Sequence, residues 1–446
     1  MNNNEQNNII AALATPYGKS AVAIIRISGR GSIELVNKFL KKPLKTGVSE
    51  YNTFVSGEFS EHLMAVGFKA PRSFTGEDSV ELYPHGNMVV CECIISALLG
   101  SGARIADRGE FTKRAFLNGK LDLMQCEALA DIIDAQTAEQ IKYGNGRYDC
   151  KYKALYEVER GLNTVLGEVE AVLHYGDELE GEDVDEVNLL KNIETTVNNC
   201  IKSLEKEKIG FEGGKIVNDG FKVALIGKPN VGKSTVLNAL TESDRAIVTP
   251  IAGTTRDTVD GEYVYNGRKF VITDTAGIND NTSDEVEKIG ISRAYSAAEG
   301  ADAVVFVVDK EGDERELLSV KPSRYAVVCN KKDEIADVGT DYARAEKGGT
   351  MQISAKYGKN ITALKQKLYD LCPKDYGSIC NHRQYGCVLK CLDALYSAAG
   401  ECKKPDGLEI VAAILYEAYS AILELYGEKA DEKIISTVFE RFCVGK

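Results

Sequence analysis

Apolar residues recur with two different spacings along the chain, and these spacings divide it into regions. Up to about residue 119, short apolar runs alternate with turn signals. The run 21–29 (AVAIIRISG) predicts a buried strand ended by a glycine, and the alternating run 79–84 (SVELYP) predicts a second strand. The segment 87–100 has helical spacing and stops at a glycine. This mixture predicts an α+β domain over residues 1–119.

Helical spacing dominates from residue 120 to about residue 209. The acidic stretch 176–186 (GDELEGEDVDE) interrupts it and is expected to be a solvated connection. The glycine-rich stretch 210–215 (GFEGGK) predicts a hinge-like linker. Helical spacing returns after residue 376 and continues to Phe442.

Between these helical regions, short apolar runs bounded by turns alternate with helical segments. This alternation is typical of a parallel sheet with crossover helices. The simplest interpretation is one helical domain in two halves, 120–215 and 376–446, with an α/β domain inserted at 216–375. Two separate helical domains are the alternative. The predicted strand sequences are FKVALIG, KFVITD, DAVVFVVD, YAVVCN and TMQISA.

A glycine-rich motif, GKPNVGKS (227–234), follows the first of these strands and opens a predicted helix. Its glycines let backbone N–H groups approach phosphate oxygens, Lys233 brings a positive charge to the β- and γ-phosphates, and Ser234 offers a hydroxyl to Mg²⁺. In a strand–loop–helix setting this pattern predicts a nucleotide phosphate site. The predicted contacts are Asn230, Val231, Gly232, Lys233, Ser234 and Thr235.

Two further motifs point to guanine as the base. NKKD (330–333) follows a predicted strand, and its Asp333 can accept hydrogen bonds from the N1–H and 2-amino group of guanine, a pair that adenine does not offer. SAK (354–356) follows another strand, where backbone N–H groups can contact the base oxygen. The predicted base contacts are Asn330, Lys331, Asp333, Ser354, Ala355 and Lys356.

The remaining two motifs belong to the phosphate side. DTAG supplies an aspartate and a glycine whose N–H can sense the γ-phosphate, and TTRD (254–257) supplies a threonine for Mg²⁺. Together, these spaced motifs predict GTP binding. The predicted contacts in DTAG are Asp274, Thr275, Ala276 and Gly277.

The position after DTAG departs from the simplest GTPases, which place there a glutamine that orients the attacking water. Here it is Ile278, which forms no side-chain hydrogen bond. Asn230 can offer a carbonyl to a monovalent cation, which would take the charge position of an arginine finger. An acid in TSDEVEKIG (282–290) is the second candidate; by charge alone Asp284, Glu285 and Glu287 are equivalent.

Composition and charge argue against a basic nucleic-acid-binding protein, a secreted protein and a membrane-spanning protein. The chain has 446 residues and a formal net charge of −13, so it has no overall attraction to nucleic acid or to an acidic membrane. Its 12 cysteines form no C-x-x-C pair, and the polar start MNNNEQNNII lacks the features of a signal peptide. Free thiols in a cytoplasmic protein are expected. No apolar run approaches the ~20 residues of a membrane helix.

Motifs from one end of the chain to the other resemble the MnmE (TrmE) family of tRNA-modification GTPases. They are ATPYGKSAVAIIRISG (14–29), SFTGEDSVEL (73–82), RGEFTKRAFLNGKLDL (108–123), the phosphate loop, IAGTTRD (251–257), DTAGI with DEVEKIGI, and the final FCVGK. The resemblance implies an N-terminal tetrahydrofolate-binding and dimerisation domain and a Ras-like GTPase domain inserted in a helical domain.

The function implied by this resemblance is modification of the wobble uridine of certain tRNAs. A flavoprotein partner, MnmG (GidA), and the GTPase install an aminomethyl or carboxymethylaminomethyl group at C5. The one-carbon unit comes from a 5-formyl- or methylene-tetrahydrofolate. Matching the motifs places folate contacts at Arg26, Glu81 and Lys120, with Lys446 close by.

The resemblance also implies GTP hydrolysis that depends on K⁺ and on dimerisation of the GTPase domains. The matching motifs assign Mg²⁺ binding to Ser234 and Thr255 and the positioning of the attacking water to Glu287. Glu285 is the alternative, because the spacing after DTAG is one residue longer than expected. K⁺ ligands fall to Asn230, Thr249, Ile251 and Thr254, Ile251 acting through its backbone carbonyl.

The final RFCVGK places Cys443 near the implied one-carbon chemistry, where it is either a chemical group or a small packing residue. Two other functions stay open at this point. A ribosome-assembly GTPase shares the nucleotide motifs but usually adds a basic RNA-binding domain, which is not evident here. A folate-binding scaffold with a vestigial GTPase conflicts with the intact Lys233, Ser234, Asp274 and Asp333.

Overall fold

The computed structural model describes residues 8–149, 153–175, 186–242, 261–274, 298–310, 322–333, 349–404 and 408–446. The chain divides into two compact units, which we describe separately. The first comprises Met1–Ile133, Arg147–Lys151 and Ser420–Lys446, and the second Asp134–Gly146 and Tyr152–Tyr419. Within the described residues, no helix combines the length and apolar character needed to cross a membrane.

The first unit contains a six-stranded sheet, in which only β1 and β8 are parallel neighbours. One face packs on α2 (Met88–Gly100) and α1 (Ser32–Asn37) through a core of aliphatic side chains. In order across the sheet, the strands are β4 (Glu50–Ser56), β5 (Phe59–Phe68), β6 (Ser79–Tyr83), β3 (Ile25–Ser28), β1 (Ile10–Leu13) and β8 (Arg104–Ile105).

Two of the three N-terminal predictions hold. Strand β6 and helix α2 lie where the spacing placed them, and the Asn87 side chain caps α2 by accepting from the Val89 N–H at 2.9 Å. The single strand predicted over 21–29 is wrong. The chain forms β2 (Ser20–Val22), which is exposed and pairs with β7 (His85–Gly86), and then a separate β3. The residue pattern alone does not reveal that β2 pairs with β7 while β3 pairs with β1 and β6.

Three further helices belong largely to this unit: α3 (Glu110–Leu117), α4 (Leu123–Asp134) and α15 (Glu432–Glu440). Apolar side chains of all three pack together, including Ala115, Cys126 and Phe439. Helix α15 thereby holds the end of the chain against the N-terminal part of the sequence.

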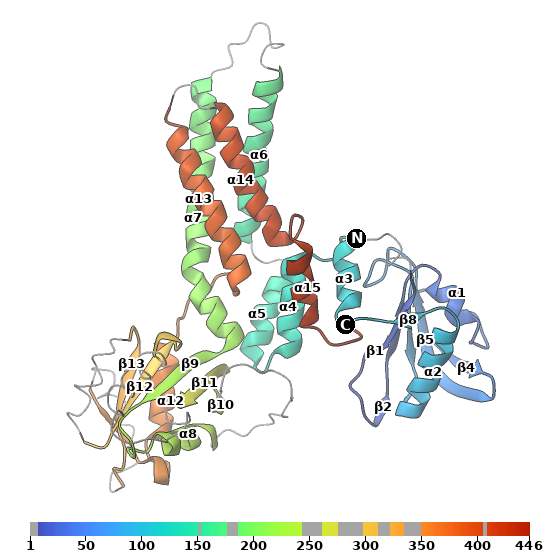
Figure 1. Cartoon of the computed structure of the whole chain (residues 1–446), viewed down its shortest axis with the longest axis horizontal. Helices are drawn as coiled ribbons and strands as arrows, with labels where there is room; N and C mark the ends of the chain where they lie inside the picture. Colours follow the sequence, from blue (N-terminus) through green and yellow to red (C-terminus); the bar gives the residue numbers. More distant parts are fainter. Residues whose placement is uncertain are drawn as a thin grey trace. The chain divides into compact units, whose positions relative to one another are not determined.

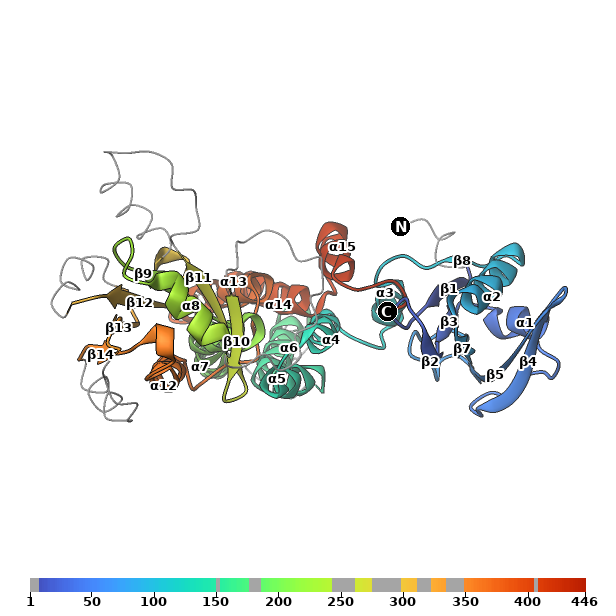
Figure 2. The same ribbon diagram turned by 90° about the horizontal axis from the view of Figure 1, so that it is seen from below.

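The second unit contains a six-stranded sheet in which five strands are parallel and β10 is an antiparallel edge strand. Helices α8 (Lys233–Glu242) and α12 (Ile361–Leu371) pack on one face (Figures 1 and 2). The predicted parallel sheet with crossover helices is confirmed. Its strands in order are β10 (Gly261–Tyr265), β11 (Arg268–Asp274), β9 (Phe221–Ile226), β12 (Ala303–Val308), β13 (Tyr325–Cys329) and β14 (Met351–Gln352).

Helices that precede this sheet in the sequence pack against helices that follow it. Helix α7 (Glu186–Asp219) lies along α6 (Lys153–Tyr175) and α13 (His382–Glu401), and α14 (Leu408–Tyr426) runs beside them (Figure 1). The first helical region also includes α5 (Ala138–Tyr148). The acidic stretch 176–186 falls mostly outside the described residues.

The linker predicted over 210–215 is wrong, because α7 continues through it. Its glycines face the segment that leaves the α/β sheet: a Cβ at Gly213 would lie 2.2 Å from the Asp375 carbonyl oxygen, and one at Gly210 2.3 Å from the Gly377 nitrogen. The Gly377 N–H donates to the Gly210 carbonyl at 3.0 Å, and the Ser378 N–H to Glu207 Oε2 at 2.6 Å. The glycines therefore allow close packing and do not form a hinge.

Candidate functional sites

The phosphate loop joins β9 to α8 in the second unit. Asn230 (φ 62°) and Gly232 (φ 94°) adopt left-handed conformations, which turn the loop tightly before the helix begins. Lys233 is buried, and its Nζ donates to the carbonyl oxygens of Gly227 at 2.9 Å and Lys228 at 3.1 Å. Its ammonium is therefore held inside the loop that the sequence predicts for phosphates. Val231 lies in the loop, and Ser234 and Thr235 in the first turn of α8.

Asn330 connects the phosphate loop to the SAK motif. Its side chain is buried, its Nδ2 donates to the Val231 carbonyl at 3.0 Å, and its Oδ1 accepts from the Ala355 N–H at 3.1 Å. A Cβ at Gly232 would lie 2.5 Å from this Nδ2, so the glycine is needed for the approach. Asn330 therefore holds the phosphate loop and the SAK motif together, in addition to being part of NKKD.

Asp333 is fixed by contacts from the neighbouring strand and turn. Ser354 Oγ donates to its Oδ1 at 2.6 Å, and Lys359 Nζ donates to its backbone oxygen at 2.7 Å. Lys331 has a left-handed φ of 64°, and Lys356 stands in the short 3₁₀ helix Ala355–Tyr357. The structure brings NKKD, SAK and the phosphate loop together at the carboxyl ends of β13, β14 and β9.

The switch residues of the prediction fall largely outside the described part of the chain. Asp274 is the last residue of β11, and its backbone pairs with Leu225 of β9, immediately before the phosphate loop. The other predicted residues lie in segments that the structure does not describe: Thr249, Ile251, Thr254, Thr255, Thr275, Ala276, Gly277, Glu285 and Glu287.

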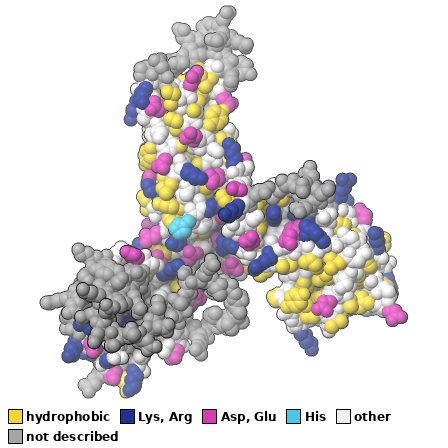
Figure 3. All heavy atoms as spheres, viewed as in Figure 1, with side chains coloured by type: hydrophobic (Ala, Val, Ile, Leu, Met, Phe, Trp, Pro, Cys, Tyr) yellow, Lys and Arg dark blue, Asp and Glu magenta, His cyan; other side chains and the backbone are white. Residues whose placement is uncertain are grey.

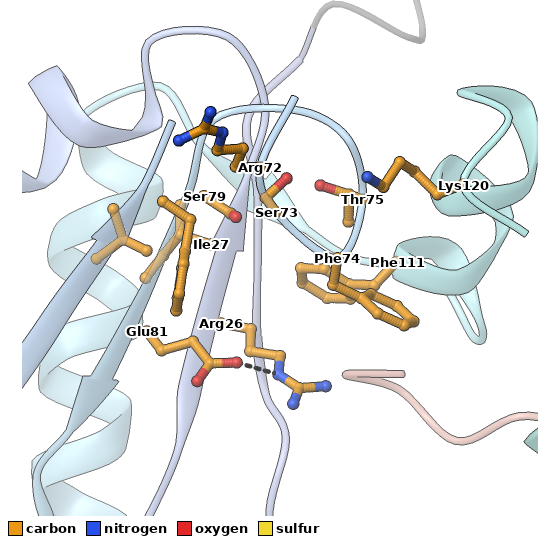
Figure 4. A pocket seen from close by; sticks show the side chains of 12 residues that line it. Arg26, Ile27, Arg72, Ser73, Phe74, Thr75, Ser79, Glu81, Phe111 and Lys120 are labelled. Carbon is orange, nitrogen blue, oxygen red and sulfur yellow. Dashed lines mark hydrogen bonds and ion pairs between the residues drawn. The ribbon is translucent and has the colours of Figure 1, made fainter. Parts of the chain in front are cut away.

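The first unit holds a cavity of about 420 Å³ between β3, β6, the loop before β6 and α3. Phe74 and Phe111 form an aromatic wall, with Ile27 opposite (Figure 4). Arg26 and Glu81 lie at one end, and Arg72 and Lys120 at the other (Figure 4). The cavity therefore has an apolar middle, one end with a carboxylate, and one end with two cations.

Arg26 and Glu81 are cross-strand partners on β3 and β6, and Arg26 Nε donates to Glu81 Oε1 at 2.8 Å. Tyr83, two residues along the same strand, donates from its hydroxyl to Glu81 Oε2 at 2.5 Å. Burial and this carboxylate raise the pKa of Tyr83 to about 12, so it remains a donor at neutral pH. Tyr83 was not predicted as part of the site from the sequence, although its alternation with Glu81 on one strand is visible there.

Lys120 follows α3, and its Nζ donates to the Pro71 carbonyl at 3.2 Å, next to Arg72. Arg72 was also not predicted from the sequence. The loop that carries it is supported by Arg114, which is 5% exposed and pairs with Glu77 at 3.0 Å and with Glu110 at 3.0 Å. These buried pairs fix the loop against α3.

The last residues of the chain lie against this cavity. Arg26 Nη1 donates to the Gly445 carbonyl at 3.4 Å, and the Phe111 N–H donates to the Lys446 carbonyl at 3.1 Å. Gly445 has a φ of 94°, and a Cβ there would lie 2.5 Å from the Leu13 carbonyl oxygen. Cys443 is exposed, and its carbonyl accepts from the Gly109 N–H at 3.3 Å. The structure thus brings Arg26, Glu81 and Lys120 to one cavity, and the backbone of Lys446 is hydrogen-bonded to Phe111 in its wall.

Family models match both units. A model described as GTP-binding protein TrmE N-terminus matches residues 9–120, which contain all of the residues that line the cavity. A model described as 50S ribosome-binding GTPase matches residues 222–331, from β9 to the start of NKKD. Among solved structures, the G domain of the T. maritima iron transporter FeoB is 25% identical over 34% of this chain and 99% of its own, with a TM-score of 0.25.

Curated relatives are similar over nearly the whole chain. The tRNA modification GTPase MnmE of Thermotoga petrophila is 37% identical over 98% of this chain and 99% of its own. The protein of the same name from Carboxydothermus hydrogenoformans is 35% identical over 98% of this chain and 99% of its own. Because this identity extends through the cavity, the phosphate loop and the final helices, the chain belongs to the MnmE family of tRNA modification GTPases.

Proposed function

We propose that this GTPase acts with an FAD-dependent, MnmG (GidA)-like protein to add an aminomethyl or carboxymethylaminomethyl group at C5 of the wobble uridine of certain tRNAs. The observation that carries the proposal is a cavity lined by Arg26, Glu81 and Lys120, with the final residues hydrogen-bonded to its wall, in the same chain as a complete set of GTP motifs. A nucleotide switch without modification chemistry does not require such a cavity.

The chemistry of the cavity lining supports a tetrahydrofolate as the ligand. Its aromatic wall, Phe74 and Phe111, suits a flat ring, and a carboxylate such as Glu81 can accept from the amide-like donors of a pterin. Lys120 at the other end suits the carboxylates of a glutamate tail. When bound, a 5-formyl- or methylene-tetrahydrofolate supplies the one-carbon unit. Arg26 orients Glu81, and Cys443 lies in the segment bonded to the cavity wall.

Arg26→Ala is expected to weaken folate binding about 10- to 100-fold, because it removes a charged hydrogen-bond partner of Glu81. GTP turnover should stay at the wild-type rate, since the nucleotide motifs belong to the other unit. Calorimetric titration with 5-formyltetrahydrofolate measures the first quantity, and phosphate release the second.

Arg30→Ala is the matched control, because Arg30 is an exposed arginine of the same domain that does not line the cavity. It should bind folate as the wild type does. Equal folate affinity in Arg26→Ala and the wild type would reject this site. If even the wild type fails to bind folate, the ribosome-assembly alternative becomes the better proposal.

We further propose that GTP hydrolysis uses Mg²⁺ at Ser234 and Thr255 and K⁺ at Asn230, with Thr249, Ile251 and Thr254 completing the K⁺ site. Lys233 binds the phosphates, and Glu287 positions the attacking water. The exposed Asn230 in its left-handed conformation supports this assignment, because it leaves the side-chain amide at the loop surface. A cation there supplies charge that other GTPases obtain from an arginine finger.

Turnover in KCl is therefore expected to exceed turnover in NaCl at equal ionic strength, by about tenfold or more. Asn230→Gly should remove most of this gain, because glycine keeps the left-handed backbone and removes only the amide. Phosphate release in both salts provides the measurement. Equal, appreciable wild-type rates in the two salts would contradict the K⁺ site.

The proposed assembly is a cytoplasmic homodimer formed through the N-terminal domain. Figure 3 shows hydrophobic side chains gathered on that domain. On its sheet, Tyr51 (64% exposed) and Met64 (39% exposed) are cross-strand partners and form an exposed apolar pair. The net charge of −13 gives no general attraction to RNA, which suits binding of tRNA together with a partner protein. The molar mass of the full chain in solution tests the dimer.

A further inference from the structure

The turn between β14 and α12 holds Asp333 at two points. It runs from Ser354 to Lys359 and contains the short 3₁₀ helix Ala355–Tyr357, followed by Gly358 in a left-handed conformation (φ 70°). Ser354 Oγ donates to Asp333 Oδ1 at 2.6 Å, and Lys359 Nζ donates to the Asp333 backbone oxygen at 2.7 Å. One residue at each end of the turn therefore bonds to the same aspartate.

Backbone hydrogen bonds keep Ser354 and Lys359 opposite each other. The Ser354 N–H donates to the Lys359 carbonyl at 3.2 Å, and the Lys359 N–H donates to the Ser354 carbonyl at 3.0 Å. The next residue, Asn360, is buried in a left-handed conformation (φ 60°), and its Nδ2 donates to the Gln352 carbonyl at 3.0 Å. The backbone of Lys359 is therefore fixed on both sides, and its side chain extends from a fixed point.

Asp333 depends on hydrogen bonds more than its neighbours in NKKD do. Asn330 is buried, and the Lys332 N–H donates to the Ile353 carbonyl at 3.1 Å. Asp333 comes directly after this backbone bond, and its side chain is exposed. Because packing does not hold an exposed side chain, the position of Asp333 is set by the two bonds from the turn.

The orientation of Asp333 matters because guanine presents two donors side by side. A carboxylate accepts from both the N1–H and the 2-amino group only when both of its oxygens face that edge of the base. A rotation of the Asp333 backbone would turn one oxygen away and leave a single bond. Ser354 restrains the carboxylate of this residue, and Lys359 restrains its backbone.

We propose that Lys359 is a positioning residue for guanine recognition. Its ammonium holds the backbone of Asp333 through a charge-assisted bond, so that the carboxylate meets both donors of the base. Lys359 lies outside NKKD and SAK, and only the folded turn brings it to Asp333. The inference rests on the proposed role of Asp333 in base recognition, and it names the group that sets the orientation of that residue.

Inosine diphosphate is the probe that isolates this role. It differs from GDP only in lacking the 2-amino group, so it offers Asp333 one donor instead of two. Displacement of a fluorescent guanine nucleotide from the full-length protein gives the dissociation constants of GDP and inosine diphosphate. The wild type is expected to prefer GDP about 10- to 100-fold, because inosine diphosphate lacks one hydrogen bond to a charged group.

Lys359→Met removes the ammonium and keeps most of the side-chain stem. We expect it to lower the preference for GDP about fivefold, by weakening the binding of GDP more than that of inosine diphosphate. A residue that only supported the fold would weaken both nucleotides equally. Turnover at saturating GTP should stay within about twofold of the wild type, because the phosphates are bound by a different segment. Lys359→Arg can still donate and should keep most of the preference.

Lys374→Met is the matched control, because Lys374 is an exposed lysine of the same unit that follows α12. It should keep the wild-type preference for GDP. An unchanged preference in Lys359→Met would overturn the proposal, and so would an equal fall in Lys359→Met and Lys374→Met, since loss of any lysine charge would then suffice. A wild type that binds both nucleotides equally would overturn it together with the role of Asp333, whereas the first two results leave that role intact.

Discussion

Replacing Lys233 with alanine is expected to lower the rate of GTP hydrolysis about 10²- to 10³-fold or more. The Lys233 ammonium is buried and donates to the carbonyls of Gly227 and Lys228, so it is positioned inside the phosphate loop. Alanine removes the positive charge that we propose contacts the β- and γ-phosphates. Phosphate release at saturating GTP and Mg²⁺ measures the effect.

Lys228→Ala is the control for this variant. It removes the same charge from the same loop, but Lys228 is exposed and lies before the turn. Its turnover should stay within about threefold of the wild type, because an exposed charge is strongly screened. If Lys233→Ala kept more than about a tenth of wild-type turnover, the phosphate loop would not carry the predicted role.

Asp333→Asn is expected to reduce GTP affinity about 10³-fold and to shift the preference towards xanthosine nucleotides. Guanine presents two donors to a carboxylate, whereas xanthine presents a carbonyl where guanine has its amino group. The asparagine amide can donate to that carbonyl. Ser354 Oγ can still donate to the side-chain oxygen of residue 333, so this side chain is expected to keep its position.

Competition between GTP and xanthosine triphosphate for a fluorescent guanine nucleotide measures this preference. Asp370→Asn makes the same chemical change on an exposed position of α12 and should leave the preference unaltered. Full guanine selectivity in Asp333→Asn would show that NKKD does not read the base.

Local patterns predicted the elements that depend on local sequence. Strand β6 alternates, α2 begins at a capping asparagine and ends at a glycine, and strands β12 and β13 of the parallel sheet are almost entirely apolar. The nucleotide motifs were also predictable, because their spacing relative to strands is part of the pattern. The hydrogen bonds by which Asn330 joins the phosphate loop to SAK could not be predicted, because only the folded sheet brings these segments together.

The errors arose where a distant segment decides the local structure. Glycines at 210, 213 and 214 lower helix propensity, and nothing nearby in the sequence indicates that residues 375–379 pack on them. Arg72 was not predicted for a similar reason, because it becomes informative only when β3, the loop before β6 and α3 enclose one space. Tyr83 becomes informative once Glu81, its hydrogen-bond partner on the same strand, is seen to line that space.

The glycine-lined contact on α7 has a consequence for how this chain can be rebuilt. The Gly377 N–H donates to the Gly210 carbonyl, so the segment that follows the α/β domain contacts α7, the helix that precedes the domain. The ends of the intervening module therefore meet at a fixed junction, and a few residues suffice to reconnect them. Such a junction lets a whole nucleotide-binding module be exchanged for that of a relative while α6, α7 and α13 keep their packing.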